Sequence, residues 1–499
     1  MNPPHQQPPT TCPGVARRTF LADMGMGVAG MALGNVLLAP GLAGAEPGGK
    51  GPRGPESGPH FEPKAKSVIW LFLCGGLSPM ETFDPKPALD KFDGKTILQT
   101  PYRDLLDPEK NPFQVKLERA AETRPILRTQ TKFKQYGESG IPVSDFFPHI
   151  GQRIDDIAVV RSFWTTTALH EAQLQFHTGR RSLEGGLPTV GSWVTYGLGS
   201  LNQNLPEFVV LGKPADTCCG SDFVYGAGYL GPQYGGVRLH LDRKDPLPFL
   251  QVEGGSILPE ERTAQLRVLQ DLNKLNYIEY PDDPDLTARI KSYELAARMQ
   301  TSVPDTLDLE KESKETRELY GLDENETRDF GTMCLVARRL AQRGVRFTQV
   351  FHQTSGFGPW DAHRNFVKEH EQPARQVDKP IAGLLTDLKR SGMLEETLVV
   401  CATEFGRTPS TALAQDGGKG REHNPFGFTC WLAGGGVKGG VIHGATDELG
   451  YHAVEDRHYL TDLHATVMHQ LGLDSRRLSL PGRRRLDIDH GEPIRAILA

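Results

Sequence analysis

Short apolar runs separated by amphipathic segments dominate the chain from residue 67 onwards. The runs are continuous rather than alternating, which is typical of strands that are covered on both faces of a sheet. They span residues 68–73, 157–162, 207–211, 345–351, 398–402 and 428–432. Segments with helical periodicity follow at residues 328–344, 372–392 and 459–474, and the first two end near a glycine. This alternation predicts an α/β fold with a doubly wound, mainly parallel sheet.

Some segments depart from this rhythm. Residues 255–330 contain two amphipathic helical patterns with no strand between them, so we expect a helical insertion there. Residues 46–66 are rich in glycine and proline and are expected to form a flexible linker. These boundaries leave a main domain at residues 67–490 and a short C-terminal tail at residues 491–499.

The first 45 residues have the pattern of an export signal. Arg17 and Arg18 precede a weakly apolar stretch rich in glycine and alanine, and residues 43–45 (Ala-Gly-Ala) offer a cleavage site. We expect a twin-arginine signal peptide and a mature protein that is periplasmic or secreted, without a transmembrane anchor. A membrane anchor is the alternative, but the apolar part is short and is interrupted by glycine and proline.

The charge and the cysteine content narrow the classes of binding partner and metal site. The net charge is -6, so no basic field favours nucleic acid. No cysteine pair has the C-x-x-C spacing of a structural zinc site. Cys74, Cys401 and Cys430 lie inside apolar runs and are expected in the core. Cys218 and Cys219 are adjacent, and the sequence leaves their oxidation state open.

Acidic and imidazole side chains follow several apolar runs. Ligands of open parallel sheets bind beyond the carboxyl ends of the strands, so these positions are candidates for a site. Glu81 and Asp84 come after the first run. Asp361 and His363 form a D-x-H pair after the run that ends at residue 351, a spacing that suits one metal ion taking an oxygen and a nitrogen. Each pair alone fits an ordinary polar loop equally well.

Two further groups strengthen the pattern. Glu404 follows the run at 398–402, where a carboxylate needs a partner, either a metal ion or Arg407. His423 lies in a glycine-rich loop before the run at 428–432. Together these loops predict a metal site. Mixed histidine and carboxylate ligands fit zinc, manganese or iron, whereas an all-oxygen subset favours calcium or magnesium.

Thr165–Arg181 is the most histidine-rich candidate stretch. On a helix, His170 and His177 would share one face about two turns apart. His170 is a candidate base or ligand, whereas His177 is expected to pack. Other histidines show no ligand-like spacing; they are His443 and His452 around a loop near the expected site, and His464 and His469 in a helical pattern.

Several long motifs occur in one order along most of residues 67–490. They include "GGLSPMETFDPKP", "VRSFWTTTALHEAQLQFHTGRR", "WDAHRN", "TLVVCATEFGRTP" and "GREHNPFGFTCWLAGGGVKGG". In this order the chain resembles the bacterial sulfatase-like proteins of domain-of-unknown-function family 1501, common in planctomycetes, within the alkaline phosphatase and sulfatase superfamily. The resemblance implies an alkaline phosphatase-like sheet with one or two metals at its strand ends. The corresponding ligand positions are Glu81 or Asp84, Asp361, His363, Glu404 and His423.

The chain also departs from that superfamily. Its enzymes commonly carry Asp-His where this chain has Glu404 and Phe405, which removes one ligand. Sulfatases convert a cysteine to their nucleophile, and the corresponding position here is Leu169, with Gln173 at the position of a sulfatase arginine. No cysteine or serine is available there for conversion to formylglycine, so the standard sulfatase mechanism is not expected.

Two hypotheses remain for function. The first is a hydrolase of sulfate or phosphate esters that depends on a divalent zinc, manganese or calcium ion. Its nucleophile would be a threonine of residues 165–167, with Thr167 favoured, or a water molecule with His170 as the general base. Arg180 or Arg407 would pair with the anionic group of the ester. The second is a non-catalytic exported protein that binds a polysaccharide, an envelope component or a partner protein. A purely structural role explains the acids least well.

Overall fold

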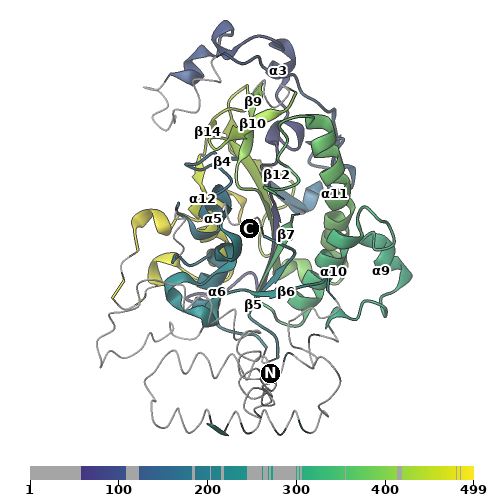
Figure 1. Cartoon of the computed structure of the whole chain (residues 1–499), viewed down its shortest axis with the longest axis vertical. Coiled ribbons are helices and arrows are strands. Elements are labelled where there is room, and N and C mark those ends of the chain that lie inside the picture. Colours follow the sequence, from purple (N-terminus) through teal and green to yellow (C-terminus); the bar gives the residue numbers. More distant parts are fainter. Residues whose placement is uncertain are drawn as a thin grey trace, which may run out of the picture.

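The computed structural model describes residues 58–107, 123–181, 186–243 and 306–499, with gaps at 203, 215–218, 354–355, 413–418, 479, 481 and 484, and isolated positions between 261 and 303. A central sheet lies between two layers of helices (Figure 1). Within these ranges the sheet has nine strands. The fold is therefore α/β, as predicted.

Six strands of the sheet agree closely in their bounds with the six predicted runs, whereas the strands at residues 237–239, 441–443 and 458–459 were not predicted. The sheet contains β1 (Ser67–Leu73), β4 (Ile157–Trp164), β5 (Phe208–Leu211), β6 (Val237–Leu239), β7 (Phe347–His352), β8 (Thr397–Ala402), β11 (Phe428–Ala433), β12 (Val441–His443) and β15 (His458–Tyr459). Small two-stranded sheets are formed by β2 (Phe133–Tyr136) with β3 (Ile141–Ser144), β9 (Gly406–Thr411) with β10 (Arg421–Asn424), and β13 (Ala445–Thr446) with β14 (Ala453–Glu455). The strand order of the nine-stranded sheet is β12-β4-β11-β8-β1-β7-β5-β6, with β15 also paired to β4. In this sheet β11 runs antiparallel to β4 and β8, and the other pairings are parallel.

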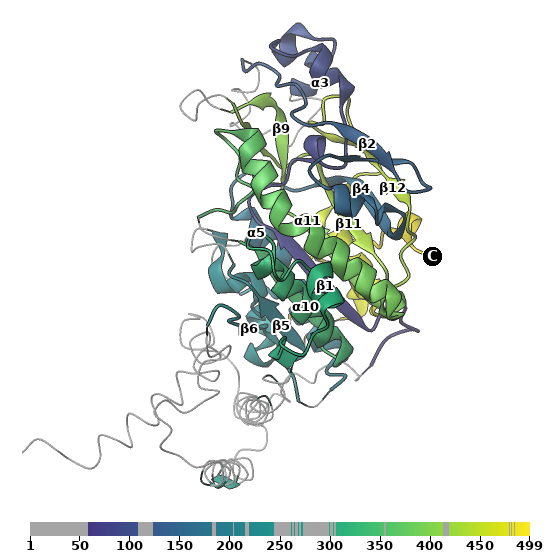
Figure 2. The ribbon, with the colours of Figure 1, turned by 90° about the vertical axis from the view of Figure 1, so that its right-hand side faces the viewer.

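Helices cover both faces of the sheet. The helices of the described residues are α3 (Pro87–Lys91), α4 (Pro148–Gly151), α5 (Ala172–Thr178), α6 (Val190–Leu198), α9 (Lys314–Leu319), α10 (Arg328–Gln342), α11 (Phe366–Arg390) and α12 (Leu460–Gln470), of which α3 lies away from the sheet. Figure 2 shows α10 and α11 side by side over one face, and Figure 1 shows α5, α6 and α12 on the other side. α11 starts earlier than its apolar pattern predicts because the Asn365 side chain accepts a hydrogen bond from the Lys368 N–H and caps the helix.

β1 shows why the strands are apolar without alternation. Ile69, Leu71 and Leu73 belong to the core beneath α10 and α11. Val68, Trp70 and Phe72 belong to the second core, which includes residues of α5, α6 and α12. Successive side chains point to opposite faces, so a strand between two helical layers needs an apolar residue at every position.

β11 brings a further segment to the functional edge of the sheet. The parallel strands β1, β7 and β8 end at the edge where their polar loops begin. Because β11 is antiparallel to β8, it begins at that edge, and β10, which precedes β11, lies there as well. Because β11 is reversed, the segment that precedes it lies next to the loops that follow β1, β7 and β8.

The helix in the 165–181 stretch is shorter than expected. α5 begins at Ala172, so His170 lies in the turn before it rather than on the same helical face as His177. His177 is buried, and its ring packs near Trp70 and Phe72. The expectation of a shared face was wrong, whereas the expectation that His177 packs is confirmed.

The predicted boundary segments have different outcomes. The signal at residues 1–45 and most of the 255–330 insertion lie outside the described residues. Residues 58–66, expected in the linker, make backbone hydrogen bonds to Gly472 and Gln470, so this part of the segment is attached to the domain. The tail at 491–499 buries Ile494 and Ile497 and is also part of the packed unit.

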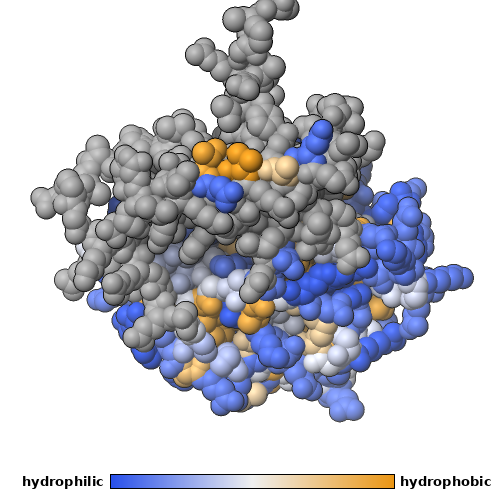
Figure 3. All heavy atoms as spheres, turned by 90° about the horizontal axis from the view of Figure 1, so that it is seen from below, coloured by the Kyte–Doolittle hydropathy of each residue, from blue (hydrophilic) through white to orange (hydrophobic). Residues whose placement is uncertain are grey.

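In the view from below, the visible described residues are mainly hydrophilic, with some hydrophobic ones among them (Figure 3). Among the described residues, no helix combines the length and apolar character needed to cross a membrane. Cys74, Cys401 and Cys430 are buried, as expected, and Cys218 lies outside the described residues.

Candidate metal centre

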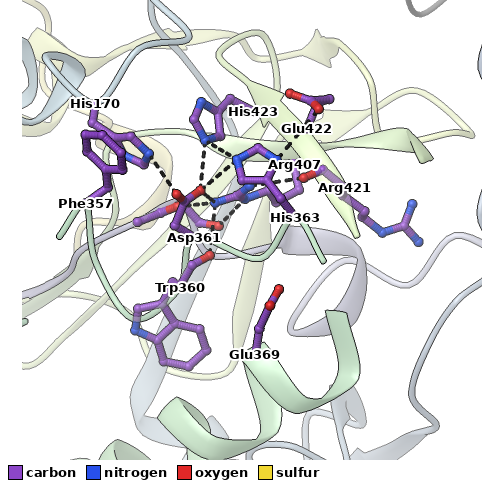
Figure 4. A network of polar contacts seen from close by, with 12 residues as sticks. His170, Phe357, Trp360, Asp361, His363, Glu369, Arg407, Arg421, Glu422 and His423 are labelled. Carbon is purple, nitrogen blue, oxygen red and sulfur yellow. Dashed lines mark hydrogen bonds and ion pairs between the residues drawn. The ribbon is translucent and has the colours of Figure 1, made fainter. Parts of the chain in front are cut away.

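The Asp361 carboxylate is the centre of a cluster of imidazoles (Figure 4). Its Oδ1 lies 2.9 Å from Nε2 of His363 and 3.0 Å from Nε2 of His423. The two imidazole Nε2 atoms are 3.0 Å apart. Oδ2 of the same carboxylate lies 3.4 Å from Nε2 of His170. Within the described chain, His170, Asp361 and His423 form a group whose ligand atoms all lie within 4.8 Å of one another.

These side chains come from different elements. Asp361 and His363 follow β7, His423 is on β10, and His170 follows β4. Their side chains remain 7–21% exposed, so the cluster is accessible from outside while most of each side chain is buried.

His423 presents an unprotonated nitrogen to the cluster. Its Nδ1–H donates to the Ala168 carbonyl over 2.6 Å, which leaves the lone pair of the neutral ring on Nε2. Burial, followed by the Arg407 charge, lowers the pKa of His423 to about 3, so the ring is neutral near pH 7. Its Nε2 therefore faces a carboxylate oxygen at 3.0 Å with no proton of its own.

His363 supplies a proton in the metal-free protein. Burial lowers its pKa, but hydrogen bonds to Asp361 and Glu422 outweigh that effect and raise the pKa to about 9. The protonated ring donates from Nε2 toward both Asp361 and His423. A single proton thus lies between Nε2 of His363, Nε2 of His423 and Oδ1 of Asp361.

His170 is oriented by Glu404. Its Nδ1 lies 3.1 Å from Oε1 of Glu404, and its Nε2 faces Asp361 without a well-aligned hydrogen bond. Burial lowers the pKa of His170, but Asp361 and Glu404 together produce a net rise. One face of the ring is stacked on Phe357, with centroids 4.7 Å apart and planes at 5°.

Glu404 is fully buried and is held by donors on all sides. The Gly75 N–H donates to both of its oxygens, at 2.9 and 3.1 Å. The Gln173 amide donates to Oε1 and the Thr403 hydroxyl to Oε2. Glu404 thus contacts His170 and lies outside the group of possible ligand atoms formed by His170, Asp361 and His423, in contrast to its predicted ligand position. Gln173 was not predicted to have this positioning role, because nothing in its local sequence indicates its contact with Glu404.

Arg407 fixes the position of Asp361. The guanidinium is fully buried, and its Nη2 lies 2.9 Å from Oδ1 of Asp361. It also donates to the carbonyls of Gly75, Gly76, Trp360 and Arg421. Because these acceptors take up the N–H groups of the guanidinium, Arg407 is placed to hold the site together, not to receive an anionic substrate. It also does not form the alternative ion pair with Glu404.

Burial raises the pKa of the Asp361 carboxyl, but its contacts with His170, His363, His423 and Arg407 lower it well below its usual range. The carboxylate is therefore ionised at all ordinary pH values. This is the state that a metal ligand requires.

Glu81 and Asp84 do not join the cluster. Glu81 forms a fully buried ion pair with Arg421, with Nη2 and Oε1 2.6 Å apart. Asp84 pairs with Lys86 at 3.0 Å and accepts from the Thr446 hydroxyl. Both acids already have partners contributed by distant parts of the chain, which corrects the predicted ligand set.

The candidate nucleophile and the second candidate arginine also have other roles. Thr167 Oγ1 accepts from the Leu169 N–H and lies 3.4 Å from Glu171, so it stabilises the turn before α5. Arg180 pairs with Asp489 at 2.6 Å. These contacts are with Leu169, Glu171 and Asp489, not with Asp361 or its imidazoles.

Comparison with known proteins places these motifs in a family. The family model described as "Protein of unknown function (DUF1501)" matches residues 65–498. No curated protein matches the chain.

Solved structures with a similar arrangement include enzymes of several kinds. The lipoteichoic acid synthase LtaP from Listeria monocytogenes is 9% identical, with 86% of this chain and 76% of that chain covered and a TM-score of 0.36. The PsFucS1 sulfatase from Pseudoalteromonas sp. is 12% identical, with 85% and 74% covered and a TM-score of 0.33. The alkaline phosphatase from the Antarctic bacterium TAB5 is 9% identical, with 82% and 97% covered and a TM-score of 0.31.

Removing Glu81 is expected to destabilise the protein without affecting metal binding. Glu81→Ala leaves the buried Arg421 charge without its carboxylate, at a cost of about 3–5 kcal/mol in the free energy of unfolding. Urea denaturation of Glu81→Ala and of the exposed control Glu310→Ala, expected to stay within about 0.5 kcal/mol, measures the difference. Loss of bound metal from folded Glu81→Ala protein would restore Glu81 as a ligand.

The titration of His363 tests the cluster directly. In metal-free protein its imidazole should titrate with a pKa of about 9, and Asp361→Asn should lower that pKa because the main stabilising carboxylate is gone. Since the folded pKa is raised, the stabilising contribution is present below the ordinary histidine pKa and is lost as the pH rises through about 9. Histidine NMR titration measures both; an unchanged pKa in Asp361→Asn contradicts the arrangement.

Proposed function

This chain belongs to the DUF1501 family, and we propose that it is an exported, metal-dependent hydrolase of sulfate or phosphate esters that uses no formylglycine nucleophile. The observation that carries the proposal is the convergence of three imidazoles on the Asp361 carboxylate. The ester class rests on the resemblance of the motifs to sulfatase-like proteins. Export rests on the twin-arginine pattern in residues 1–45.

The donor set fits a divalent transition metal. Nε2 of His423 carries a lone pair toward Oδ1 of Asp361, an unfavourable approach that a cation between them would make favourable. Nε2 of His170 is buried without a well-aligned partner. Three imidazoles with one carboxylate suit zinc, manganese or iron, whereas calcium prefers oxygen ligands throughout. His170, Asp361, His363 and His423 would hold the ion.

A bound metal ion would polarise the ester and lower the pKa of a water molecule. The surrounding residues keep the donors ready for this role. Glu404 accepts from Nδ1 of His170 and so leaves Nε2 of the neutral ring directed toward the cluster, the same orienting role that a carboxylate has behind a metal-bound histidine. Arg407 keeps Asp361 ionised and in place.

Where Nε2 of His170 is not a metal ligand, His170 instead has the features of a general base. Its Nε2 is the acceptor nitrogen of the neutral ring when Nδ1 donates to Glu404, and the ring remains 7% exposed. A water molecule near Nε2 would lose its proton to this nitrogen, and the ester would then be attacked by water rather than by Thr167. Phe357, stacked on the ring and 48% exposed, limits the rotation of His170 and covers one side of it.

The principal test measures metal and turnover together. We expect the mature protein to bind zinc or manganese with Asp361 essential, so Asp361→Asn loses that metal while the matched control Asp84→Asn retains it. Elemental analysis gives the stoichiometry, and aryl sulfate and aryl phosphate assays give the activity. If the protein contains no metal and shows no turnover after zinc or manganese is added, the hydrolase proposal is ruled out. If it binds metal but shows no turnover, the result favours the alternative of a non-catalytic binding protein.

Metal affinity should rise with pH. At pH 7 the proton on His363 has to leave before the nitrogen can bind, so the affinity increases by up to about tenfold per pH unit until the pKa of about 9 is reached. His423 contributes no such dependence, because its pKa of about 3 leaves it neutral, whereas the raised pKa of His170 adds to the dependence. Zinc titrations between pH 6 and 9 measure the slope; a flat profile means that His363 is not a ligand.

Glu404→Gln should reduce turnover more than substrate binding. The amide no longer favours the His170 tautomer with its acceptor at Nε2, so kcat is expected to fall by roughly 10²–10⁴-fold. Steady-state kinetics separate kcat from KM, and the metal content of the variant shows whether His170 acts as ligand or base. Unchanged kcat with full metal content contradicts both roles.

A further inference from the structure

A second pair of histidines lies apart from the Asp361 cluster. His443 ends β12 and His458 begins β15, and both strands pair with β4. Their Nε2 atoms are 2.9 Å apart. The two side chains are 15–16% exposed, so the pair is largely buried but open to solvent.

Each imidazole has a carboxylate behind its other nitrogen. Nδ1 of His458 donates to Oδ2 of Asp462 over 2.9 Å, which places the lone pair of the neutral ring on Nε2. Nδ1 of His443 lies 3.9 Å from Oδ2 of Asp456. Asp456 is 67% exposed, so its side chain has room to approach. A carboxylate behind the distal nitrogen is the usual support of a metal-binding histidine.

The backbone holds both halves of the pair in place. His443 aligns with Val160 and His458 with Phe163 in the β4 register. Oδ1 of Asp462 accepts from the Glu492 N–H, which fixes the carboxylate behind His458. Asp456 has a positive φ of 43° in the turn before β15, and its carbonyl accepts from the Ser162 hydroxyl. A non-glycine residue in this conformation is uncommon and persists where surrounding contacts hold it.

We propose that His443 and His458 form a second binding site for a divalent late transition-metal cation such as zinc or copper. The two Nε2 atoms are the protein ligands, Asp462 orients His458 through its Nδ1, and water fills the remaining positions. Imidazole donors select these cations over calcium and magnesium. Bound here, the ion connects β12 to β15 at the edge of the sheet beside β4. The site is independent of the proposed hydrolase centre.

Zinc titration of the full chain separates the two sites. In the Asp361→Asn background we expect one equivalent of zinc by calorimetry and an upward shift of the thermal midpoint, because the ion binds the folded state. His443→Asn or His458→Asn in that background should remove both the equivalent and the shift. His149→Asn, a substitution of an exposed histidine elsewhere, is the control and should retain both.

The outcomes are distinct for each proposal. Zinc binding that persists unchanged in both His443→Asn and His458→Asn overturns the second site, as does the absence of any zinc binding in Asp361→Asn. Loss of zinc from His149→Asn as well means that the histidine pair is not specific, which also overturns it. The proposed hydrolase centre fails instead if the unmodified protein binds no more zinc than the Asp361→Asn variant.

Discussion

The buried Arg407 guanidinium is the interaction on which the candidate centre depends. It pairs with Asp361 and donates to carbonyls of the turn after β1, the loop after β7 and β10. These segments come from distant parts of the sequence. A fully buried charge is unfavourable unless every donor has an acceptor, so the loops that supply those acceptors are held to one arrangement. Asp361 is placed by the same requirement.

The turn after β1 has to lie close to the Asp361 loop for this arrangement to exist. Gly75 has a φ of 119°, and a Cβ at this position would lie 2.6 Å from the Asp361 backbone nitrogen. The absence of a side chain therefore allows the Gly75 carbonyl to reach Arg407 and its N–H to reach Glu404. One glycine connects the residue that holds Asp361 with the residue that orients His170.

The sequence predicted the secondary-structure elements better than the contacts between side chains from distant parts of the chain. Continuous apolar runs are local signals, and β1, β4 and β8 follow from them because both faces of these strands are covered. The structure also brings together Asp361, His363 and His423, which the sequence placed in loops that follow or precede predicted strands. Glu81 was placed wrongly because its partner Arg421 lies 340 residues away, and no local pattern reveals that pairing. His170 was placed on a helix that starts two residues later, since the turn before α5 has no strong start signal.

The position of Arg407 beside Asp361 has a consequence for the charge of any ligand. The Asp361 and Glu404 carboxylates and the Arg407 guanidinium leave a single formal negative charge among these buried groups when the imidazoles are neutral. A divalent ion bound as proposed would reverse this to a single positive charge. A monoanion, such as a sulfate monoester or a phosphodiester, would then give an electrically neutral assembly, whereas a phosphate monoester dianion would leave an excess negative charge among largely buried groups. For the proposed hydrolase, charge balance thus favours singly charged esters.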